Sequence, residues 1–357
     1  MTRLFDPIEI RGLSIKNRLW VAPMCQYMSH TNDGKVQPWH EVNYGVLARG
    51  GAGLAMVEAT GVLPEGRITP RCLGLWSDDQ IAGLSRIADF AHSNGAKIGI
   101  QLNHAGRKAS TYEMFPNVAA GSVPISEGGW STIAPSAVAF DNFYEPSIAT
   151  VDEMDRIVEA FRAAAARATA AGFDVIEIHS AHGYLLHELL SPISNRRDDE
   201  YGGSLENRAR LHRRILRSIK ADQPEAVIFV RISASEWVED GFDVDETVKV
   251  STWFAQDGAD LIDISSGGNV PVAPIPVRPS YQVPLAQAVK ANSPIPVGVA
   301  GLITQASQAE SILTTGQADV ICIGREALRD PQFAHKWAKE LRADSNVVPA
   351  PLWRGYL

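Results

Sequence analysis

The sequence is poor in cysteine and has no long apolar run. Its 357 residues include three cysteines, an odd number that argues against a disulfide framework and for a reducing compartment. No segment is long and apolar enough to cross a bilayer, and the first residues lack the pattern of a signal peptide. We therefore expect a cytoplasmic globular protein that does not enter a membrane.

Positive charge is also in short supply. The chain has 33 Lys and Arg against 41 Asp and Glu, which gives a formal net charge of −8. Nucleic-acid-binding proteins usually carry a broad basic surface, so this balance argues against such a partner while leaving room for a local basic pocket. Glycine and proline are spread along the chain rather than clustered, which argues against disorder.

A short apolar run followed by an amphipathic stretch recurs along the chain. Runs of this kind, rich in Val and Ile, are typical of parallel strands covered on both faces. Eight such runs in one chain predict a single-domain (β/α)8 TIM barrel over residues 1–357. No G-x-G-x-x-G motif follows an early run, which disfavours an open dinucleotide-binding sheet. The runs lie at residues 19–22, 53–59, 97–102, 174–179, 227–232, 260–265, 295–300 and 319–323.

Three other segments extend the predicted barrel. Residues 5–15 alternate around Gly12 and predict a β-hairpin that closes the bottom of the barrel. The connections 103–150, after the third strand, and 182–204, after the fourth, are much longer than a barrel requires. Both follow the carboxyl ends of strands, where barrel active sites lie, so we expect them to be binding loops.

Two histidines and a tyrosine lie at the end of the fourth predicted strand. His179, His182 and Tyr184 would lie at the catalytic face, where they could donate hydrogen bonds, move protons or bind a metal. A zinc site needs a third ligand, which His104 could supply from the third strand. The other strand ends offer amides, arginines and serines rather than carboxylates, so a metal is the weaker interpretation.

The remaining strand ends predict a nucleotide-like ligand. Gly301 and Gly324 with Arg325 follow the seventh and eighth strands, where barrels often bind phosphate. Gln101 and Arg231 lie at the ends of the third and fifth strands and suit the polar edge of a heterocycle. Together they place a phosphate at one end of the ligand and a polar ring at the other.

In these segments the sequence resembles the Old Yellow Enzyme family of FMN-dependent ene-reductases, and most closely the bacterial branch with a cysteine near the flavin. That branch includes xenobiotic reductases and thermophilic-like ene-reductases. The likeness extends from residues 4–7 to residues 353–356. Its segments include PMCQY at 23–27, HAGRK at 104–108, HSAHGYL at 179–185, SNRR at 194–197, YGGSLENR at 201–208 and IGRE at 323–326.

The resemblance implies non-covalent FMN that is reduced by NADPH or NADH and reoxidised by enones or enals in a ping-pong cycle. It implies that Tyr27, His179 and His182 hold the substrate carbonyl. Tyr184 would be the proton donor, and Cys25 would tune the flavin. By the same resemblance FMN would contact Ala22, Pro23, Met24, Cys25, Ala59, Gln101, Arg231, Gly324 and Arg325, to which the phosphate prediction adds Gly301.

The C-terminal segment 341–357 continues beyond the last predicted helix and carries two prolines, a Trp, an Arg and a Tyr. Prolines stiffen such a tail, and Trp, Tyr and Arg are common at interfaces. The resemblance implies that Arg354 reaches the active site of a neighbouring subunit. We therefore expect a homodimer or a tetramer of dimers.

Two other functions are compatible with the residues alone. One is a metal-dependent barrel hydrolase that uses His104, His179 and His182, and the other is a flavin-binding protein without catalysis. The physiological substrate, the choice between NADH and NADPH, and the roles of Trp130 and Arg278 are left open. Trp130 could either line the substrate pocket or pack its own loop.

Overall fold

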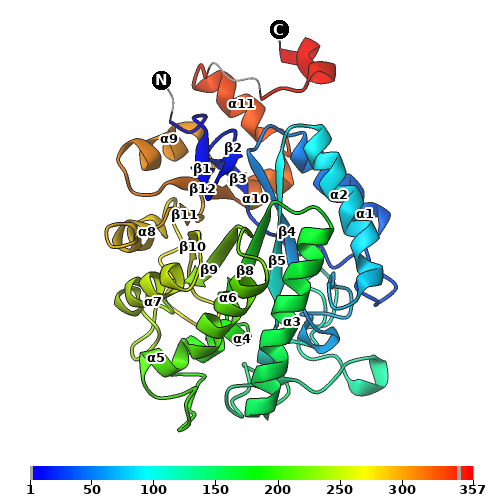
Figure 1. The fold of residues 1–357 in the computed structure, drawn as a ribbon, viewed down its shortest axis with the longest axis vertical. Helices are drawn as coiled ribbons and strands as arrows, with labels where there is room; N and C mark the ends of the chain where they lie inside the picture. Colours follow the sequence, from blue (N-terminus) through cyan, green and yellow to red (C-terminus); the bar gives the residue numbers. More distant parts are fainter. Residues whose placement is uncertain (1–2, 344–346, 357) are drawn as a thin grey trace.

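The computed structural model describes residues 3–343 and 347–356, and its centre is a closed barrel of eight parallel strands (Figure 1). Each of the eight predicted apolar runs coincides with one strand to within two residues at either end, so the predicted (β/α)8 fold is confirmed. In barrel order the strands are β3 (Leu19–Val21), β4 (Leu54–Gly61), β5 (Lys97–Asn103), β8 (Val175–Ser180), β9 (Ile228–Ser233), β10 (Leu261–Ser265), β11 (Val297–Val299) and β12 (Val320–Ile323).

Helices surround the barrel on the outside (Figure 1). They are α1 (Pro38–Ala48), α2 (Ile81–Ser93), α3 (Val151–Ala170), α4 (Leu185–Leu190), α5 (Leu205–Arg208), α6 (Arg210–Asp222), α7 (Val244–Gln256), α8 (Val283–Lys290), α9 (Ala306–Thr314), α10 (Arg325–Arg329) and α11 (Phe333–Glu340). In the part of the chain that the structure describes, none of the helices is both long and apolar enough to span a membrane.

Helix α3 shows how the sequence sets these boundaries. Thr150 and Glu153 form a capping box, in which the Thr150 hydroxyl accepts from the Glu153 N–H and the Glu153 carboxylate accepts from the Thr150 N–H. The helix buries one face, which includes Ile157 and Phe161, against the barrel. It ends just before Gly172, whose φ of 91° suits a glycine.

The predicted hairpin closes the bottom of the barrel. Strands β1 (Ile8–Ile10) and β2 (Leu13–Ile15) pair across a two-residue turn whose residues both have positive φ, the geometry of a tight hairpin. Their isoleucines pack in one cluster with the lower barrel interior, where Trp20 stacks on Phe229 with ring centroids 5.6 Å apart. The barrel is therefore filled at this end.

The two long connections lie at the other end. The connection after β5 carries two short 3-10 turns (Gly106–Lys108 and Ile125–Glu127) and the strand pair β6 (Ile133–Ala134) and β7 (Ser147–Ile148). The connection after β8 carries α4. Both leave the carboxyl ends of adjacent strands, so they border the same mouth of the barrel.

We predict that Phe161→Ala lowers the free energy of unfolding by about 3–5 kcal/mol, because a fully buried aromatic ring leaves a cavity when it is removed. Phe90→Ala is the matched control, since Phe90 also lies on a helix but is 46% exposed; it should cost less than about 1 kcal/mol. Urea unfolding of both variants measures the difference. Equal losses would contradict the assignment of Phe161 to the core.

Candidate active site

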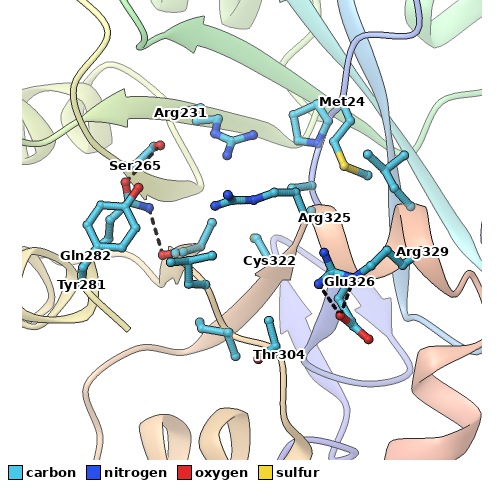
Figure 2. A pocket seen from close by; sticks show the side chains of 18 residues that line it. Met24, Arg231, Ser265, Tyr281, Gln282, Thr304, Cys322, Arg325, Glu326 and Arg329 are labelled. Atoms are coloured by element: carbon cyan, nitrogen blue, oxygen red, sulfur yellow. Dashed lines mark hydrogen bonds and ion pairs between the residues drawn. The ribbon is translucent and has the colours of Figure 1, made fainter. Parts of the chain in front are cut away.

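A cavity of about 330 Å³ opens at the carboxyl ends of the barrel strands (Figure 2). It brings together residues that the sequence predicts at four different strand ends. Of the predicted cofactor residues, those that line it are Ala22, Pro23, Met24, Arg231, Gly301, Gly324 and Arg325. The predicted phosphate end and part of the predicted ring end therefore belong to one cavity.

The cavity is built to receive negative charge. Figure 2 shows the side chains of Arg231 and Arg325 pointing into it. Arg325 is exposed and forms no ion pair with any residue in the described ranges 3–343 and 347–356, so its charge is available to a ligand. Gly301 has a φ of 128°, which favours glycine, and a Cβ there would lie 3.1 Å from the Gln282 amide. A side chain at this position would therefore press on Gln282, which lines the same cavity.

Four buried polar side chains form the floor of the barrel mouth. The Gln101 amide donates to Glu177 Oε1 at 2.7 Å, and Arg231 Nε lies 3.3 Å from Asp263 Oδ2. Burial, and then the negative charge of Asp263, raises the pKa of Glu177. Glu177 is therefore held toward its neutral form, and Arg231 keeps Asp263 as its counter-ion. Because its nitrogen faces Glu177, the Gln101 carbonyl oxygen is left for a ligand.

A second cavity of about 490 Å³ adjoins the first and shares Pro23 and Arg231 with it. Within it, His179 Nε2 and His182 Nδ1 lie 3.5 Å apart, and the His179 and Tyr184 rings have centroids 5.1 Å apart. The predicted substrate residues are thus assembled beside the predicted ring site. Its lining is Pro23, Cys25, Tyr27, Gln101, Lys108, Met114, His179, His182, Tyr184, Arg231 and Gly268.

Both histidines are neutral. Burial, followed by the positive charge of Arg231, holds the pKa of His179 and of His182 well below the usual range. His179 Nδ1 accepts the Ala181 backbone N–H at 3.3 Å, so its single proton sits on Nε2. His179 therefore offers an N–H to an oxygen atom in the cavity.

His104 is placed elsewhere. It is buried beside Gly66, accepts the Gly106 N–H on Nδ1 at 3.2 Å, and lines neither cavity. Burial lowers its pKa to about 4. Over residues 3–343 and 347–356 no group of three His, Cys, Asp or Glu side chains has the proximity that metal binding requires. The geometry gives no support to the alternative in which His104, His179 and His182 share a metal.

Glu58 binds the backbone of the segment that carries Cys25 and Tyr27. A β-bulge between Val57 and Ala59 lies at Glu58 on β4. Its carboxylate accepts the Gln26 N–H at 2.8 Å and the Tyr44 hydroxyl at 3.1 Å. Burial raises the pKa of Glu58 to about 7. Glu58 thus fixes the backbone between the two site residues.

The Cys25 side chain is a thiol in this setting. Burial raises the pKa of Cys25 well above its ordinary value, so the thiolate that a nucleophile requires is disfavoured. Ala59, a predicted contact of the cofactor, is buried in the same small cluster as Tyr27 and Tyr184, although it lines neither cavity.

Lys108 is a site residue that the sequence analysis did not single out. Its ammonium donates to the backbone carbonyls of His182 at 2.8 Å and of Gly268 at 2.9 Å, and lies over the Tyr184 ring at 5.2 Å. Burial lowers the pKa of Lys108 to about 8. The hydrogen bond from Lys108 helps to hold His182 at its left-handed φ of 62°. The only sequence signal was its membership of the segment 104–108.

Further lining residues were also missed. Ser265 closes β10, and Gln282 precedes α8, with its amide bound to the Ala300 carbonyl at 3.0 Å (Figure 2). The sequence marks Ser265 only as a polar residue at a strand end. Gln282 follows a proline-rich loop, so no pattern in the sequence placed it at the mouth.

Trp130 packs its loop against the segment that follows β4. Its indole N–H donates to the Glu65 carbonyl at 2.8 Å, and the Arg67 guanidinium lies over its ring at 5.0 Å. It lines neither cavity, which favours the packing alternative. Arg278 is exposed in the loop after β10.

Arg354 lines neither of the two cavities at the mouth of its own barrel. It belongs to a 3-10 turn (Ala350–Tyr356) that is tied to α11, where the Tyr356 hydroxyl contacts His335 Nδ1 at 3.1 Å and Gln332 Oε1 at 2.9 Å. In Figure 1 this turn lies at the same end of the molecule as the β1–β2 hairpin, which is the end away from the mouth.

Comparison with known proteins identifies relatives over nearly the whole chain. The family described as "NADH:flavin oxidoreductase / NADH oxidase family" matches residues 3–344. A protein named NADPH dehydrogenase from Halalkalibacterium halodurans is 47% identical over 341 residues, covering 95% of each chain. Another with that name from Bacillus subtilis strain 168 is 46% identical over 353 residues, covering 98% of this chain and 97% of its own.

Solved structures agree with these matches. The Old Yellow Enzyme homologue from Zymomonas mobilis has a TM-score of 0.78 at 26% identity, covering 94% of this chain and 92% of its own. Morphinone reductase in complex with tetrahydroNAD has a TM-score of 0.77 at 25% identity, covering 96% and 92%.

We predict that Glu58→Gln changes how stability depends on pH. The folded protein binds the Glu58 proton up to a pKa of about 7, against 4.5 as the ordinary value, so this group makes the free energy of unfolding fall as pH rises from 4.5 to 7. The Glu58→Gln variant has no ionisable group here, so its free energy of unfolding does not fall for this reason. Its stability relative to wild type should rise by on the order of 2–3 kcal/mol across this interval.

Urea unfolding of the FMN-loaded proteins at pH 4.5 and 7 measures this change. Glu9→Gln, at an exposed position on β1, is the control and should leave the pH dependence as it is. Parallel curves for wild type and Glu58→Gln would contradict the burial of an ionisable carboxyl at this point.

Proposed function

Because the chain belongs to the NADH:flavin oxidoreductase / NADH oxidase family, and is an NAD(P)H-dependent FMN oxidoreductase of the Old Yellow Enzyme type, we propose that it reduces the activated C=C bond of α,β-unsaturated carbonyl compounds. The observation that carries this proposal is the convergence of His179 Nε2 and His182 Nδ1 on one point, beside a buried tyrosine. Enones and enals are the small-molecule partners that such a site would take.

The first cavity fits FMN. A phosphate needs backbone N–H groups and a cation, and Gly301, Gly324 and Arg325 provide these at one end. At the other end, Nε of the buried Arg231 faces Asp263, so its two terminal nitrogens, which form no hydrogen bond within the described part of the chain, can donate to a ligand. The Gln101 carbonyl oxygen is free to accept. These are the groups that the polar edge of a flavin requires. We assign the ring contacts to Ala22, Pro23, Met24, Cys25, Ala59, Gln101 and Arg231.

FMN, when bound, would take a hydride from NAD(P)H and give it to the β-carbon of the alkene. The protein's share is to stabilise the negative charge that then develops on the carbonyl oxygen. His179 and His182 would each donate an N–H to this oxygen, as the donors of an oxyanion hole do. Because both rings are neutral, each can donate a hydrogen bond to the carbonyl oxygen without transferring its proton. The two N–H groups already face the oxygen, so they need no reorganisation during the reaction.

Tyr184 would supply the proton that the α-carbon needs. Burial raises the pKa of Tyr184 well above its ordinary value, so the phenol is protonated at neutral pH. Its ring lies against His179, on the side of the cavity where the substrate carbonyl would bind. Tyr27 would contact that carbonyl from the opposite segment. Arg231 would balance the negative charge of the reduced ring, and the Cys25 thiol would tune its potential without forming a bond.

Spectroscopy tests the proposal directly. The purified protein should be yellow, should bleach when NADPH or NADH is added without oxygen, and should recover its colour when 2-cyclohexenone follows. Recovery must be accompanied by an equal amount of cyclohexanone. Bleaching without recovery would overturn alkene reduction, and a yellow protein that neither reductant bleaches would point to a flavin binder without catalysis.

We predict that His179→Ala and His182→Ala each lower kcat for enone reduction by about 10²–10³-fold, the usual effect of losing one oxyanion donor. The FMN content should stay as in wild type, because neither side chain lines the first cavity. Anaerobic stopped-flow measurement of flavin reoxidation gives the rate. A double Ala variant that reduces enones at the wild-type rate would contradict the assignment.

The proposed assembly is a homodimer, or a tetramer of such dimers, of single-domain chains in which Arg354 enters the partner's substrate cavity. Two features support it. The tail lies at the end of the barrel away from its own mouth, and Trp353 beside Arg354 is 57% exposed. Arg354 is therefore placed to enter the cavity of a partner rather than that of its own chain.

We predict that deleting residues 352–357 lowers enone turnover and weakens the dimer together. Tyr356→Phe is the matched control, since it removes only the contact of the tail with its own α11. Light scattering gives the mass, and steady-state kinetics gives the turnover. A monomeric truncated protein with full activity would contradict the shared site.

A further inference from the structure

The backbone of His182 is fixed on both sides. Its N–H donates to Ser233 Oγ at 2.9 Å, and its carbonyl accepts from Lys108 at 2.8 Å. Its φ of 62° is in the left-handed region, so these bonds hold a conformation that a histidine adopts infrequently. With the backbone fixed, the orientation and the tautomer of the ring depend on what the two ring nitrogens meet.

Each nitrogen of the His182 ring has one neighbour. Nδ1 lies 3.5 Å from His179 Nε2, and Nε2 lies 2.7 Å from Ser265 Oγ. Since the ring is neutral, one nitrogen carries a proton and the other a lone pair. If Nε2 held the proton, the lone pair of Nδ1 would face the point to which His179 donates. A substrate oxygen there would meet one donor and one repelling lone pair.

The contact of Nδ1 with His179 Nε2, at 3.5 Å, is at the limit of hydrogen-bond distance, so the shorter hydrogen bonds around Ser265 decide between these tautomers. A hydroxyl has one hydrogen, and the acceptors within reach of Ser265 are His182 Nε2 at 2.7 Å and Gln282 Oε1 at 3.5 Å. Gln282 Oε1 already accepts the Ser266 hydroxyl at 2.6 Å. Its amide cannot turn over freely, because the nitrogen is bound to the Ala300 carbonyl at 3.0 Å. The short contact with His182 is therefore the better place for the Ser265 hydrogen.

We infer that Ser265 is a positioning residue that donates its hydroxyl to His182 Nε2 and so keeps the His182 proton on Nδ1, facing the substrate. This rests on the proposed function, because it is the carbonyl of an enone that needs two donors at this point. Ser265 makes the second donor permanent before substrate arrives. A donor that is already oriented costs no rearrangement during the reaction.

Nitrogen NMR tests the tautomer without turnover. The FMN holoenzyme is labelled with ¹⁵N at histidine, and long-range ¹H–¹⁵N spectra distinguish the protonated nitrogen from the lone-pair nitrogen. The His182 signals are identified as those that disappear in His182→Asn. In wild type we expect the proton on Nδ1. In Ser265→Ala we expect it on Nε2, with kcat for 2-cyclohexenone lowered at least about tenfold.

A pair of variants with equal volume controls for packing. Ser265→Thr keeps the hydroxyl and should keep the Nδ1 proton, with a kcat at least about tenfold above that of Ser265→Val. Ser265→Val lacks the hydroxyl and should behave as Ser265→Ala does. The dissociation constant of FMN, measured by fluorescence, should differ little between Thr and Val.

Two results would overturn the inference. One is a proton on Nε2 in wild type, and the other is the same tautomer in the variants with and without a hydroxyl. Neither depends on catalysis. A wild-type holoenzyme that fails to reduce enones would overturn the proposed function instead and leave the tautomer result as it stands.

Discussion

Arg231 is a buried cation at the centre of the barrel mouth, and the protonation of the groups around it follows from its charge and from their shared burial. A buried guanidinium is strongly unfavourable without a counter-ion, and Asp263 at 3.3 Å supplies one. A second ionised carboxylate would exceed what one cation can balance, so Glu177 is held toward its neutral form. The same positive charge, added to burial, keeps His179 and His182 neutral. Neutral histidines can donate to an oxygen atom without protonating it, which is the property that the proposed chemistry needs.

Most of the fold could be predicted from the sequence because its signal is local. A strand buried on both faces must be apolar along nearly its whole length. Each of the eight runs can therefore be recognised from its own residues, whichever strands it pairs with. The β1–β2 hairpin was also local, since Gly12 marks a turn between two alternating segments. The helix boundaries depended on caps such as Thr150 and Gly172, which lie within a few residues of the ends they set.

Apart from the resemblance, the candidate site was predictable where a residue lies at the carboxyl end of a strand. Gln101, His179 and Arg231 are among the last residues of their strands and Arg325 lies just beyond β12, and the structure places all four at the mouth. Lys108 and Gln282 act from connecting segments whose paths depend on tertiary packing. Their partners are backbone carbonyls of distant loops, and backbone carbonyls leave no mark in a sequence. The position of Arg354 relative to a partner likewise depends on a surface that a single chain does not define.

The two walls of the second cavity differ in how much variation they can accept. On one side Gly183 and Gly268 are in such close contact that a Cβ on Gly268 would lie 2.6 Å from the His182 Cα, and one on Gly183 would lie 2.2 Å from the Gly268 carbonyl oxygen. On the other side Met114 is 74% exposed and flexible in shape. Under the proposed function, changes of substrate range, in evolution or in the laboratory, can reshape the methionine wall. The glycine wall stays fixed, because a side chain on Gly268 would displace the His182 backbone and one on Gly183 would displace Gly268.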